Sequence, residues 1–475
     1  MKPVILFTPL IVLVLGGCTM TPKYHRPAPP VPAEWSGAGT TDPSGAPDAA
    51  NLSWREFFRD EKLQQVIELA LTNNRDLRIA ALNVERARAL YGIQRAELLP
   101  AVDAFASGAV QRLPADLSGS GRRQTVERYD VNLGVAAWEL DLFGRIRSLK
   151  DSALEEYLAT DQARRGAQIA LVSSVAQAYL TLAADRESLA LARATLETQQ
   201  AVYDLIKTRF DLGLIPELDV HRAQAQVDAA RADVVRYTQA VAQDRNALDL
   251  LAGGPVPEEL LPADLGTVAS PAEISAGLPS EVLLQRPDVL QAENLLKAAH
   301  ADIGAARAAF FPRISLTAAI GTASADLSGL FKAGSGAWSY APQIVMPIFD
   351  ARTWSAHRAS KVQREIAVGQ YERAIQNAFR DVNDALAVRA TVDEQIRAQE
   401  SLVRSLAETL RLATSRYERG IDSYLAVLDA QRSHHAAQQQ WIALRRLKLA
   451  NDARLYAALG GGLDQEETGR QAALK

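Results

Sequence analysis

The chain contains two copies of one pattern, and this duplication constrains its fold more than any other feature. Segment 74–100 aligns with segment 286–312 at an offset of 212 residues, so that Gly92 falls on Gly304 and Pro100 on Pro312. Farther along, Gly213 falls on Gly420 at an offset of 207 residues. A drift of only five residues, with glycines and prolines in register, indicates duplication with one changed loop. The alternative is chance similarity between alanine-rich helices.

Each copy is predicted to contain a helix, a pair of strands, a very long helix, a tight turn and a further helix. Segment 146–212 contains no proline and one glycine, which predicts 67 helical residues, or about 100 Å of helix. Val403, Leu406 and Leu410 follow the alternating steps of three and four that are typical of coiled-coil seams. A helix of this length exceeds a globular domain, so we expect it to pack against partner helices in a rod or tube.

Four segments alternate with period two: 101–112, 129–137, 313–322 and 338–349. Alternation over about ten residues is typical of strands that cross an outer membrane. Four strands leave two edges of unpaired backbone groups, which lipid cannot satisfy. Other copies of the chain must therefore close the barrel, with eight strands in a dimer or twelve around a possible lumen in a trimer. A soluble β-hairpin packed on helices is the alternative.

Aromatic residues are predicted to stand near the strand ends, where amphipathic rings favour the membrane interface. These girdle residues are Tyr129, Trp138, Phe310, Phe311, Trp338 and Tyr340, with Phe349 beyond them.

The amino terminus has the pattern of a lipoprotein signal. Lys2 precedes an apolar run, residues 4–15, that is too short to span a bilayer, and Gly16 and Gly17 precede Cys18. This stretch resembles the bacterial lipobox, which implies that mature Cys18 carries an N-acyl group and an S-diacylglycerol. Thr19, in place of the aspartate that retains lipoproteins in the inner membrane, favours the outer membrane. The alternative is an ordinary signal with a chance cysteine.

Composition excludes several other classes. The net charge is −4 and the chain has no basic block, which argues against nucleic acid as a partner. A mean hydropathy of −0.09 excludes a bundle of membrane-spanning helices. The phosphate-loop, zinc-protease and serine-hydrolase motifs do not occur, so we expect no enzyme, no metal and no cofactor other than the lipid.

The segments WELDLFGRIRSL, GLPSEVLLQRPDVLQAEN and IGAARAAFFPRISLTA, together with RAQAQV and LSGLF, resemble the outer membrane factor (TolC-like) family, in its OprM/NodT-type lipoprotein branch. The resemblance runs from Cys18 to about Gly462. It implies a mainly α fold with membrane β structure: a homotrimer with a twelve-stranded barrel that continues into a long periplasmic α-helical barrel. It also implies docking with a periplasmic membrane fusion (adaptor) protein and an inner-membrane pump of the resistance-nodulation-division class.

The implied function is that of a passive exit duct for drugs and other small molecules, located in the outer membrane. A duct for protein secretion or metal efflux shares this fold. An alternative of another class is a non-conducting coiled-coil lipoprotein that tethers envelope layers.

The resemblance places a gate at the tips where the long helices turn. The candidate tip residues are Arg209, Asp211, Gly213, Leu214, Asp219, Arg416, Tyr417, Arg419, Gly420, Ile421 and Asp422. Asp219 and Tyr417 match members of the best-known gate network, whereas Asp422 stands where that network has an arginine. We expect three copies of Asp422 to repel one another, so that arginines, or the apolar residues Leu214 and Ile421, close the tube. The alternative is that these charges belong to solvated turns.

The predicted organisation of the chain has six parts. They are a signal peptide (1–17), a lipid-anchored proline-rich segment (18–60), repeat 1 (61–252), a linker (253–285), repeat 2 (286–462) and a polar tail (463–475).

Overall fold

The computed structural model describes residues 19–32, 35, 49, 52–275 and 280–461. The predicted signal peptide, Cys18 and the polar tail lie outside these residues, as does part of the proline-rich segment. The chain forms two compact units. Unit 1 consists of residues 1–28, 83–161 and 291–371, and unit 2 consists of 29–82, 162–290 and 372–475. Each unit therefore combines parts of both repeats.

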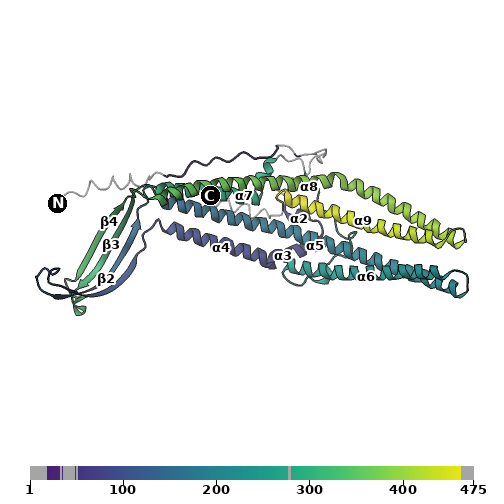
Figure 1. Cartoon of the computed structure of the whole chain (residues 1–475), viewed down its shortest axis with the longest axis horizontal. Helices are drawn as coiled ribbons and strands as arrows, with labels where there is room; N and C mark the ends of the chain where they lie inside the picture. Colours follow the sequence, from purple (N-terminus) through teal and green to yellow (C-terminus); the bar gives the residue numbers. More distant parts are fainter. Residues whose placement is uncertain (1–18, 33–34, 36–48, 50–51, 276–279, 462–475) are drawn as a thin grey trace. The chain divides into compact units, whose positions relative to one another are not determined.

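The order of elements repeats as the sequence predicts (Figure 1). The first copy comprises α4 (Arg75–Ala96), β1 (Asp103–Leu113), β2 (Gln124–Glu139), α5 (Arg145–Asp211) and α6 (Glu217–Ala252). The second comprises α7 (Pro287–Ala308), β3 (Arg313–Ser324), β4 (Gly336–Val345), α8 (Ala351–Glu418) and α9 (Tyr424–Ala458). The remaining elements are α2 (Trp54–Phe57), α3 (Glu61–Asn73) and the short 3-10 turns η2 (Glu258–Leu260), η3 (Ser280–Gln285) and η4 (Leu327–Gly329).

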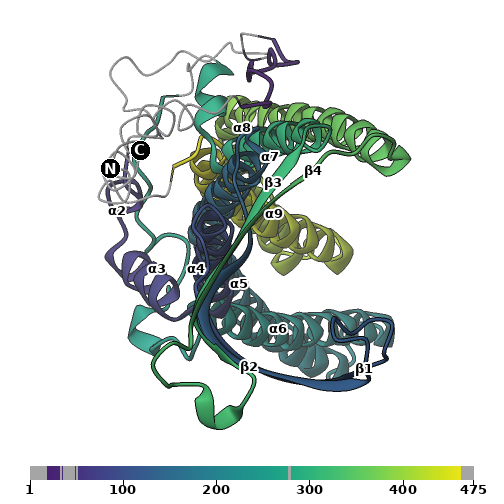
Figure 2. The ribbon, with the colours of Figure 1, turned by 90° about the vertical axis from the view of Figure 1, so that its left-hand side faces the viewer.

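In unit 1 the four strands form one antiparallel sheet in the order β1-β2-β3-β4, which Figure 2 shows as a curved ribbon. Strands β1 and β4 are its edges. Two strand boundaries differ from the prediction by more than two residues. Strand β2 begins at Gln124 rather than Tyr129, because residues 124–128 continue to pair with β1. Strand β4 ends at Val345 rather than Phe349. Pro347 lies two residues after Val345 and has no N–H to donate to a neighbouring strand.

The register sorts the sheet into an apolar and a polar face, because residues directly opposite each other point to the same side. The apolar face carries Val131, Leu133, Val135, Leu316, Ala318, Ile320 and Ile344. The polar face carries Ser107, Asp130, Asn132, Thr317, Ser339 and Gln343.

A bulge in β2 shifts this alternation near the helical end of the strand. Val135 pairs with Ala318 and Trp138 pairs with Leu316, so β2 contains one extra residue between these pairs. Ala137 has a positive φ of 52°, and its N–H donates to Thr317 Oγ1 at 3.1 Å. The bulge moves Trp138 onto the apolar face with Val135, whereas strict alternation would place it on the polar face.

The long helices follow the predicted lengths within a residue or two. Helix α5 has 67 residues and α8 has 68. In the first copy Val172, Val175, Tyr179 and Leu182 follow the same predicted steps of three and four, and all four are buried, whereas Val403, Leu406 and Leu410 of the second copy are half-buried. Among the described residues, one helix, α5, contains a window apolar enough to cross a membrane. Of that window 67% is buried inside the protein, as in a core helix.

In unit 2, close contacts join the ends of elements that are distant in sequence. The rings of Phe57 and Tyr456 stack with centroids 4.0 Å apart, and Tyr456 donates to the Leu52 carbonyl at 2.5 Å. Gly253 ends α6 with a φ of 77°, and a Cβ there would lie 2.4 Å from the Asn73 carbonyl oxygen. Only glycine fits this position without strain.

In unit 1 the amino-terminal strap, residues 19–28, packs on α7. The Arg26 guanidinium donates two hydrogen bonds to the Glu293 carboxylate, at 3.1 and 2.8 Å, and Tyr24 donates a third at 3.1 Å. The Glu293 side chain is only 3% exposed. Gly304 permits the approach, since a Cβ there would lie 2.2 Å from Thr21 Oγ1.

Candidate functional site

The tips of the two helical hairpins in unit 2 have the same backbone geometry. Gly213 and Gly420 have φ values of 73° and 69°. In the first tip the N–H of Leu214 donates to the Arg209 carbonyl at 2.9 Å, and in the second Ile421 donates to the Arg416 carbonyl at the same distance. This bond, from the residue after the glycine, is the Schellman ending, in which glycine takes the left-handed conformation. The duplication therefore extends to single hydrogen bonds at the candidate gate.

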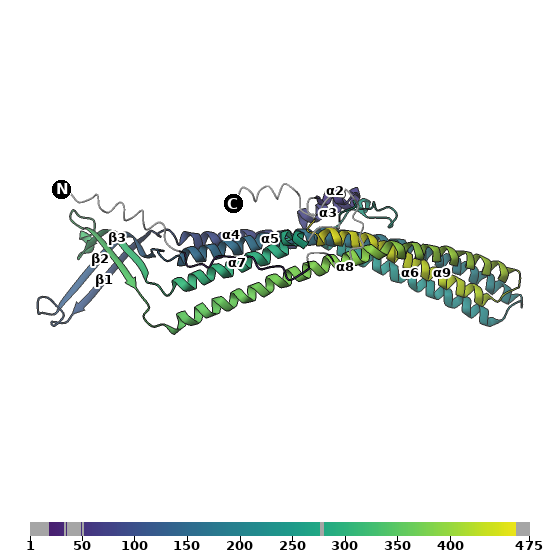
Figure 3. The same cartoon turned by 90° about the horizontal axis from the view of Figure 1, so that it is seen from above.

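A hydrophobic cluster beneath the tips joins the two hairpins, whose parallel course Figure 3 shows. Ile206 and Ala223 of the first hairpin are buried with Tyr424, Val427 and Leu428 of the second. Tyr417 packs against this cluster, and its ring lies 5.3 Å from that of Tyr424. Burial raises the pKa of Tyr424 to about 12, with smaller contributions from Tyr417 and Asp219. Tyr417 and Asp219 thus both act on Tyr424, and their role in a gate stays a prediction.

Arg416 and Asp422 form an ion pair across the second tip. Arg416 donates from Nε to Asp422 Oδ2 and from Nη2 to Oδ1, the latter at 3.0 Å. The hydrogen bonds from Arg416 hold the pKa of Asp422 below its usual range, and the carboxylate raises the pKa of Arg416 in turn. The sequence prediction treated Asp422 as an uncompensated charge, and in this respect it is wrong. Residues six apart become neighbours because the Schellman turn folds the chain back.

The other tip charges have different surroundings. The Arg209 guanidinium lies over the Tyr417 ring, 5.5 Å from its centroid, within the range of a cation–π contact. Asp219 accepts from Arg222 at 3.4 Å. Asp211 and Arg419 are exposed. Arg222 and Tyr424 were missed by the sequence prediction, although the i,i+3 spacing from Asp219 could have indicated Arg222.

Four apolar residues at the two tips are exposed. Leu214 is 69% exposed and Ile421 is 57% exposed, and Leu212 and Leu425 accompany them. Exposed apolar side chains gathered at one end of a molecule are typical of an interaction surface.

The predicted girdle residues divide into two groups. Tyr129, Trp138, Trp338 and Tyr340 all lie on the apolar face of the sheet. Tyr129 and Tyr340 lie inside their strands rather than near the ends, which corrects the prediction for these two residues. Phe310 and Phe311 lie in the connection between α7 and β3, where Phe310 packs edge-on against Trp354 and Phe311 stacks on Phe143 at 4.8 Å. Their role in a membrane girdle stays a prediction.

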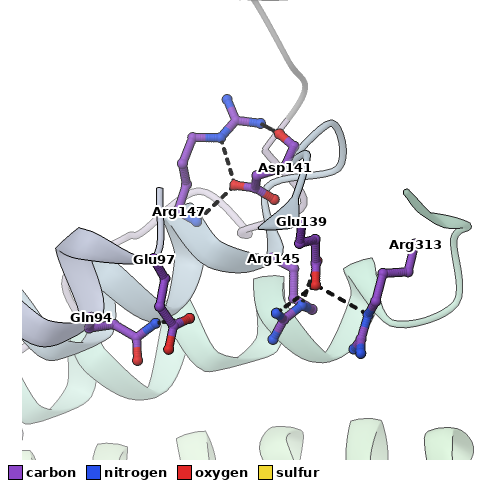
Figure 4. A network of polar contacts seen from close by, with 7 residues as sticks. All are labelled: Gln94, Glu97, Glu139, Asp141, Arg145, Arg147 and Arg313. Carbon is purple, nitrogen blue, oxygen red and sulfur yellow. Dashed lines mark hydrogen bonds and ion pairs between the residues drawn. The ribbon is translucent and has the colours of Figure 1, made fainter. Parts of the chain in front are cut away.

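A polar network ties the strands of unit 1 to the start of α5 (Figure 4). The Glu139 carboxylate lies between Arg145, which donates to it at 2.8 and 2.9 Å, and Arg313, whose Nε lies 3.2 Å away. Asp141 accepts from the backbone N–H and the Nε of Arg147, at 2.9 and 3.1 Å. The first of these contacts satisfies a free N–H at the start of α5. This network was not predicted from the sequence.

Among the described residues, the sheet has one apolar face, one polar face and two edges without a strand partner, and it is joined to helices of 67 and 68 residues. This arrangement is typical of a class of outer membrane channel protein. The model of the outer membrane efflux protein family matches residues 66–254 and 278–461, which correspond to the two repeats. The chain belongs to the outer membrane efflux protein family.

Relatives and solved structures agree with this assignment. The chain is 48% identical over 461 residues to the probable efflux pump outer membrane protein TtgC of Pseudomonas putida, covering 96% of this chain and 95% of the relative. It is 44% identical to the outer membrane protein OprJ of Pseudomonas aeruginosa, with coverage of 96% and 95%. The open-state MtrE outer membrane channel of Neisseria gonorrhoeae superposes with a TM-score of 0.84 at 38% identity, covering 94% of this chain and 99% of MtrE.

These findings confirm four of the sequence predictions. The resemblance to TolC-like proteins is correct, the fold is the duplicated one of that family, the function is that of an efflux channel, and the location is the outer membrane. The printed names describe outer membrane efflux proteins and, for MtrE, an outer membrane channel.

Proposed function

We propose that three copies of this chain close into a passive exit duct for organic small molecules. The observation that carries the proposal is the open sheet of unit 1, which has an apolar face and two edges without strand partners among the described residues. In lipid such edges must be paired, and pairing β4 of one copy with β1 of the next satisfies both. Three copies give twelve strands, enough to surround a lumen lined by the polar faces.

The duct would be driven by its partners, since transport needs an energy source. Several relatives are named as outer membrane proteins of efflux pumps for antibiotics, toluene or solvent. We therefore propose an inner-membrane pump of the resistance-nodulation-division class and a periplasmic adaptor as partners, and apolar or amphipathic organic molecules as cargo. The exposed leucine and isoleucine side chains at the tips are the surface on which the adaptor would dock.

The resting gate is proposed to lie at the same tips. Arg416 neutralises Asp422 inside each protomer, so a ring of Asp422 carries little net charge. Closure would then depend on apolar packing of Leu214 and Ile421 between protomers and on the hydrophobic cluster beneath them. Opening would separate the tips while the Schellman turns hold each hairpin together.

Two further expectations stay proposals. Cys18 would carry the N-acyl and S-diacylglycerol groups that anchor the mature chain in outer membrane lipid. Of the six girdle residues, the four on the apolar face of the sheet would contact that lipid.

Deletion of the gene tests the efflux function. In a strain that retains its pumps, we expect the deletion to raise accumulation of a fluorescent organic dye, and the wild-type gene on a plasmid to reverse the effect. Purified protein in planar bilayers supplies the second measurement, since a duct conducts ions and an envelope tether does not. Unchanged accumulation together with no conductance would refute the proposal.

A further inference from the structure

The polar network at the base of the sheet borders a cavity to which the proposed function has so far assigned no role. The cavity has a volume of about 360 Å³ and lies within unit 1. Its walls include Glu139, Arg145 and Arg313 from the network and Phe143 and Phe311 from the connections beside it. This volume is within the range of about 300–1,000 Å³ that is usual for small-molecule sites.

The strand register places the cavity on the polar face of the sheet. Glu139 pairs with Ser315, Ser315 pairs with Gln343, and Arg313 pairs with Val345. All five of these residues line the cavity. They lie on the same face of the sheet as Asn132 and Asp130. In a closed barrel that face lines the lumen, so the cavity opens to the transport path. The inference rests on the proposed function in this one respect.

Three carboxylates around the cavity are each bound by an arginine. Glu139 is bound at both oxygens by Arg145. Asp141 is held by Arg147, and Asp350 is held by Arg352 at 3.0 and 3.2 Å. Arg313 also contacts the Glu139 carboxylate, through its Nε at 3.2 Å, and the Arg313 side chain is 58% exposed. Among the described residues, the two terminal nitrogens of Arg313 have no partner, and Figure 4 shows the side chain at the side of the network away from Arg147.

An aromatic surface lies beside this cation. The Phe143 and Phe311 rings stack with centroids 4.8 Å apart and an interplanar angle of 20°. Phe311 remains 39% exposed, so an edge or face of its ring is available to a third ring. Arg313 and Phe311 are two residues apart in the connection from α7 into β3, which holds both at the cavity.

We propose that this cavity is a contact site for aromatic carboxylates that pass through the duct. The terminal nitrogens of Arg313 would bind the carboxylate in the two-point geometry that a guanidinium favours. The ring of the solute would pack on Phe311. The Glu139 carboxylate does not oppose binding, since Arg145 neutralises it and the shared Nε contact orients Arg313.

Equilibrium dialysis of 2-naphthoate against the purified full-length protein in detergent tests the site. We expect saturable binding of one molecule per chain, reduced about tenfold or more in Arg313→Gln, since a hydrogen bond to a charged group is lost. Phe311→Ala should also weaken binding. Arg128→Gln is the matched control, because Arg128 lies on the same face, carries the same charge and pairs with Asp130 away from the cavity. It should bind naphthoate like the wild type.

A second comparison keeps the test independent of any misfolded variant. On the wild-type protein, 2-naphthylmethanol has the same ring without the charge and should bind about tenfold more weakly than naphthoate. Equal binding of the two probes, or equal loss in Arg313→Gln and Arg128→Gln, would overturn the proposal. Channels that conduct but bind no naphthoate would remove this site and leave the duct. Protein that binds naphthoate but does not conduct would support the binding site and contradict the duct.

Discussion

The guanidinium of Arg416 holds the carboxylate of Asp422 across the tip of the second hairpin, with Nη2 and Oδ1 3.0 Å apart. The pair exists because Gly420 reverses the chain between the two residues. It turns two separate charges at this tip into one neutral unit, and three such units around an axis would neither repel nor attract one another strongly. The charge state of the proposed gate would therefore depend on a contact within one protomer.

Asp422→Asn should raise the resting conductance of channels in planar bilayers. The substitution leaves Arg416 without its carboxylate, so three like charges face one another at the closed tips. Asp228→Asn is the control, since it breaks an exposed pair with Arg231 on α6 at 3.0 Å without changing the tip. Equal conductance in the two variants would remove the pair from the gate.

The same pair predicts how the wild-type gate responds to pH. Because the folded pKa of Asp422 is lowered, the pair is present above the ordinary carboxylate pKa of about 4 and is lost only as the pH falls through the lowered value. Resting conductance measured from pH 8 to pH 5 should therefore show no step from Asp422. A step in that range that disappears in Asp422→Asn would contradict the assignment.

Gly253→Ala should destabilise unit 2, whereas Gly254→Ala should not. A Cβ on Gly253 would meet the Asn73 carbonyl oxygen at 2.4 Å, at a φ of 77° that alanine rarely adopts. A Cβ on Gly254 would meet nothing within 4 Å. We expect a loss of about 2 kcal/mol or more in the first variant and a change near zero in the second, measured as melting temperature in detergent. Equal melting temperatures would show that the α3–α6 contact relaxes easily.

Glu293→Ala should release the amino-terminal strap from α7. The buried carboxylate accepts from both Arg26 and Tyr24, and its removal leaves those donors without their partner. Because Arg26 is half-exposed and can be solvated, we expect a modest cost of about 1–2 kcal/mol and faster cleavage near residue 28 in limited proteolysis. Glu68→Ala, which removes an exposed partner of Arg55, is the control and should leave the cleavage rate unchanged.

Asp452→Asn should stabilise the protein at pH 7.5 and not at pH 4. Burial raises the pKa of Asp452 to about 6, despite the opposing effect of Lys448 and Arg389. A carboxyl group whose pKa is higher in the folded than in the unfolded chain stabilises the fold most below the unfolded pKa, about 4 for aspartate. The free energy of unfolding therefore falls as the pH rises from about 4 through the folded pKa of about 6. Removing the charge should restore about 1–3 kcal/mol at the higher pH.

Thermal melts at the two pH values measure this difference. Asp228→Asn is the control, because Asp228 is exposed, pairs with Arg231 at 3.0 Å and is not one of the groups that shift the pKa of Asp452. A pH-independent effect of Asp452→Asn would show that its carboxylate is solvated.

Most of the fold could be predicted because its signals are local and repeated. The 67-residue length of α5 follows from the absence of proline, and the seam through Val172 and Tyr179 follows from the spacing of apolar residues. Glycine at 213 and 420 predicted the tight turns, since few residues other than glycine take the left-handed conformation readily.

The errors have a common physical origin, since each depends on which segments lie together. The length of β2 is set by how far β1 continues to pair with it, and the face of Trp138 is set by the bulge opposite Leu316. The partner of Asp422 is set by the turn at Gly420. The network around Glu139 needs Arg313, which is 174 positions away in the chain.

The sequence by itself determined the duplication and the order of helices and strands. These depend on periodicity and on residues that start or end an element, which act over a few positions. The class of channel followed from the resemblance of several segments to a known family. Only the tertiary structure decided the register of the sheet, the two-point ion pair at the tip and the cavity beside Arg313. Each of these is a contact whose free energy depends on distance and on exclusion of water, and a linear pattern of residues carries neither.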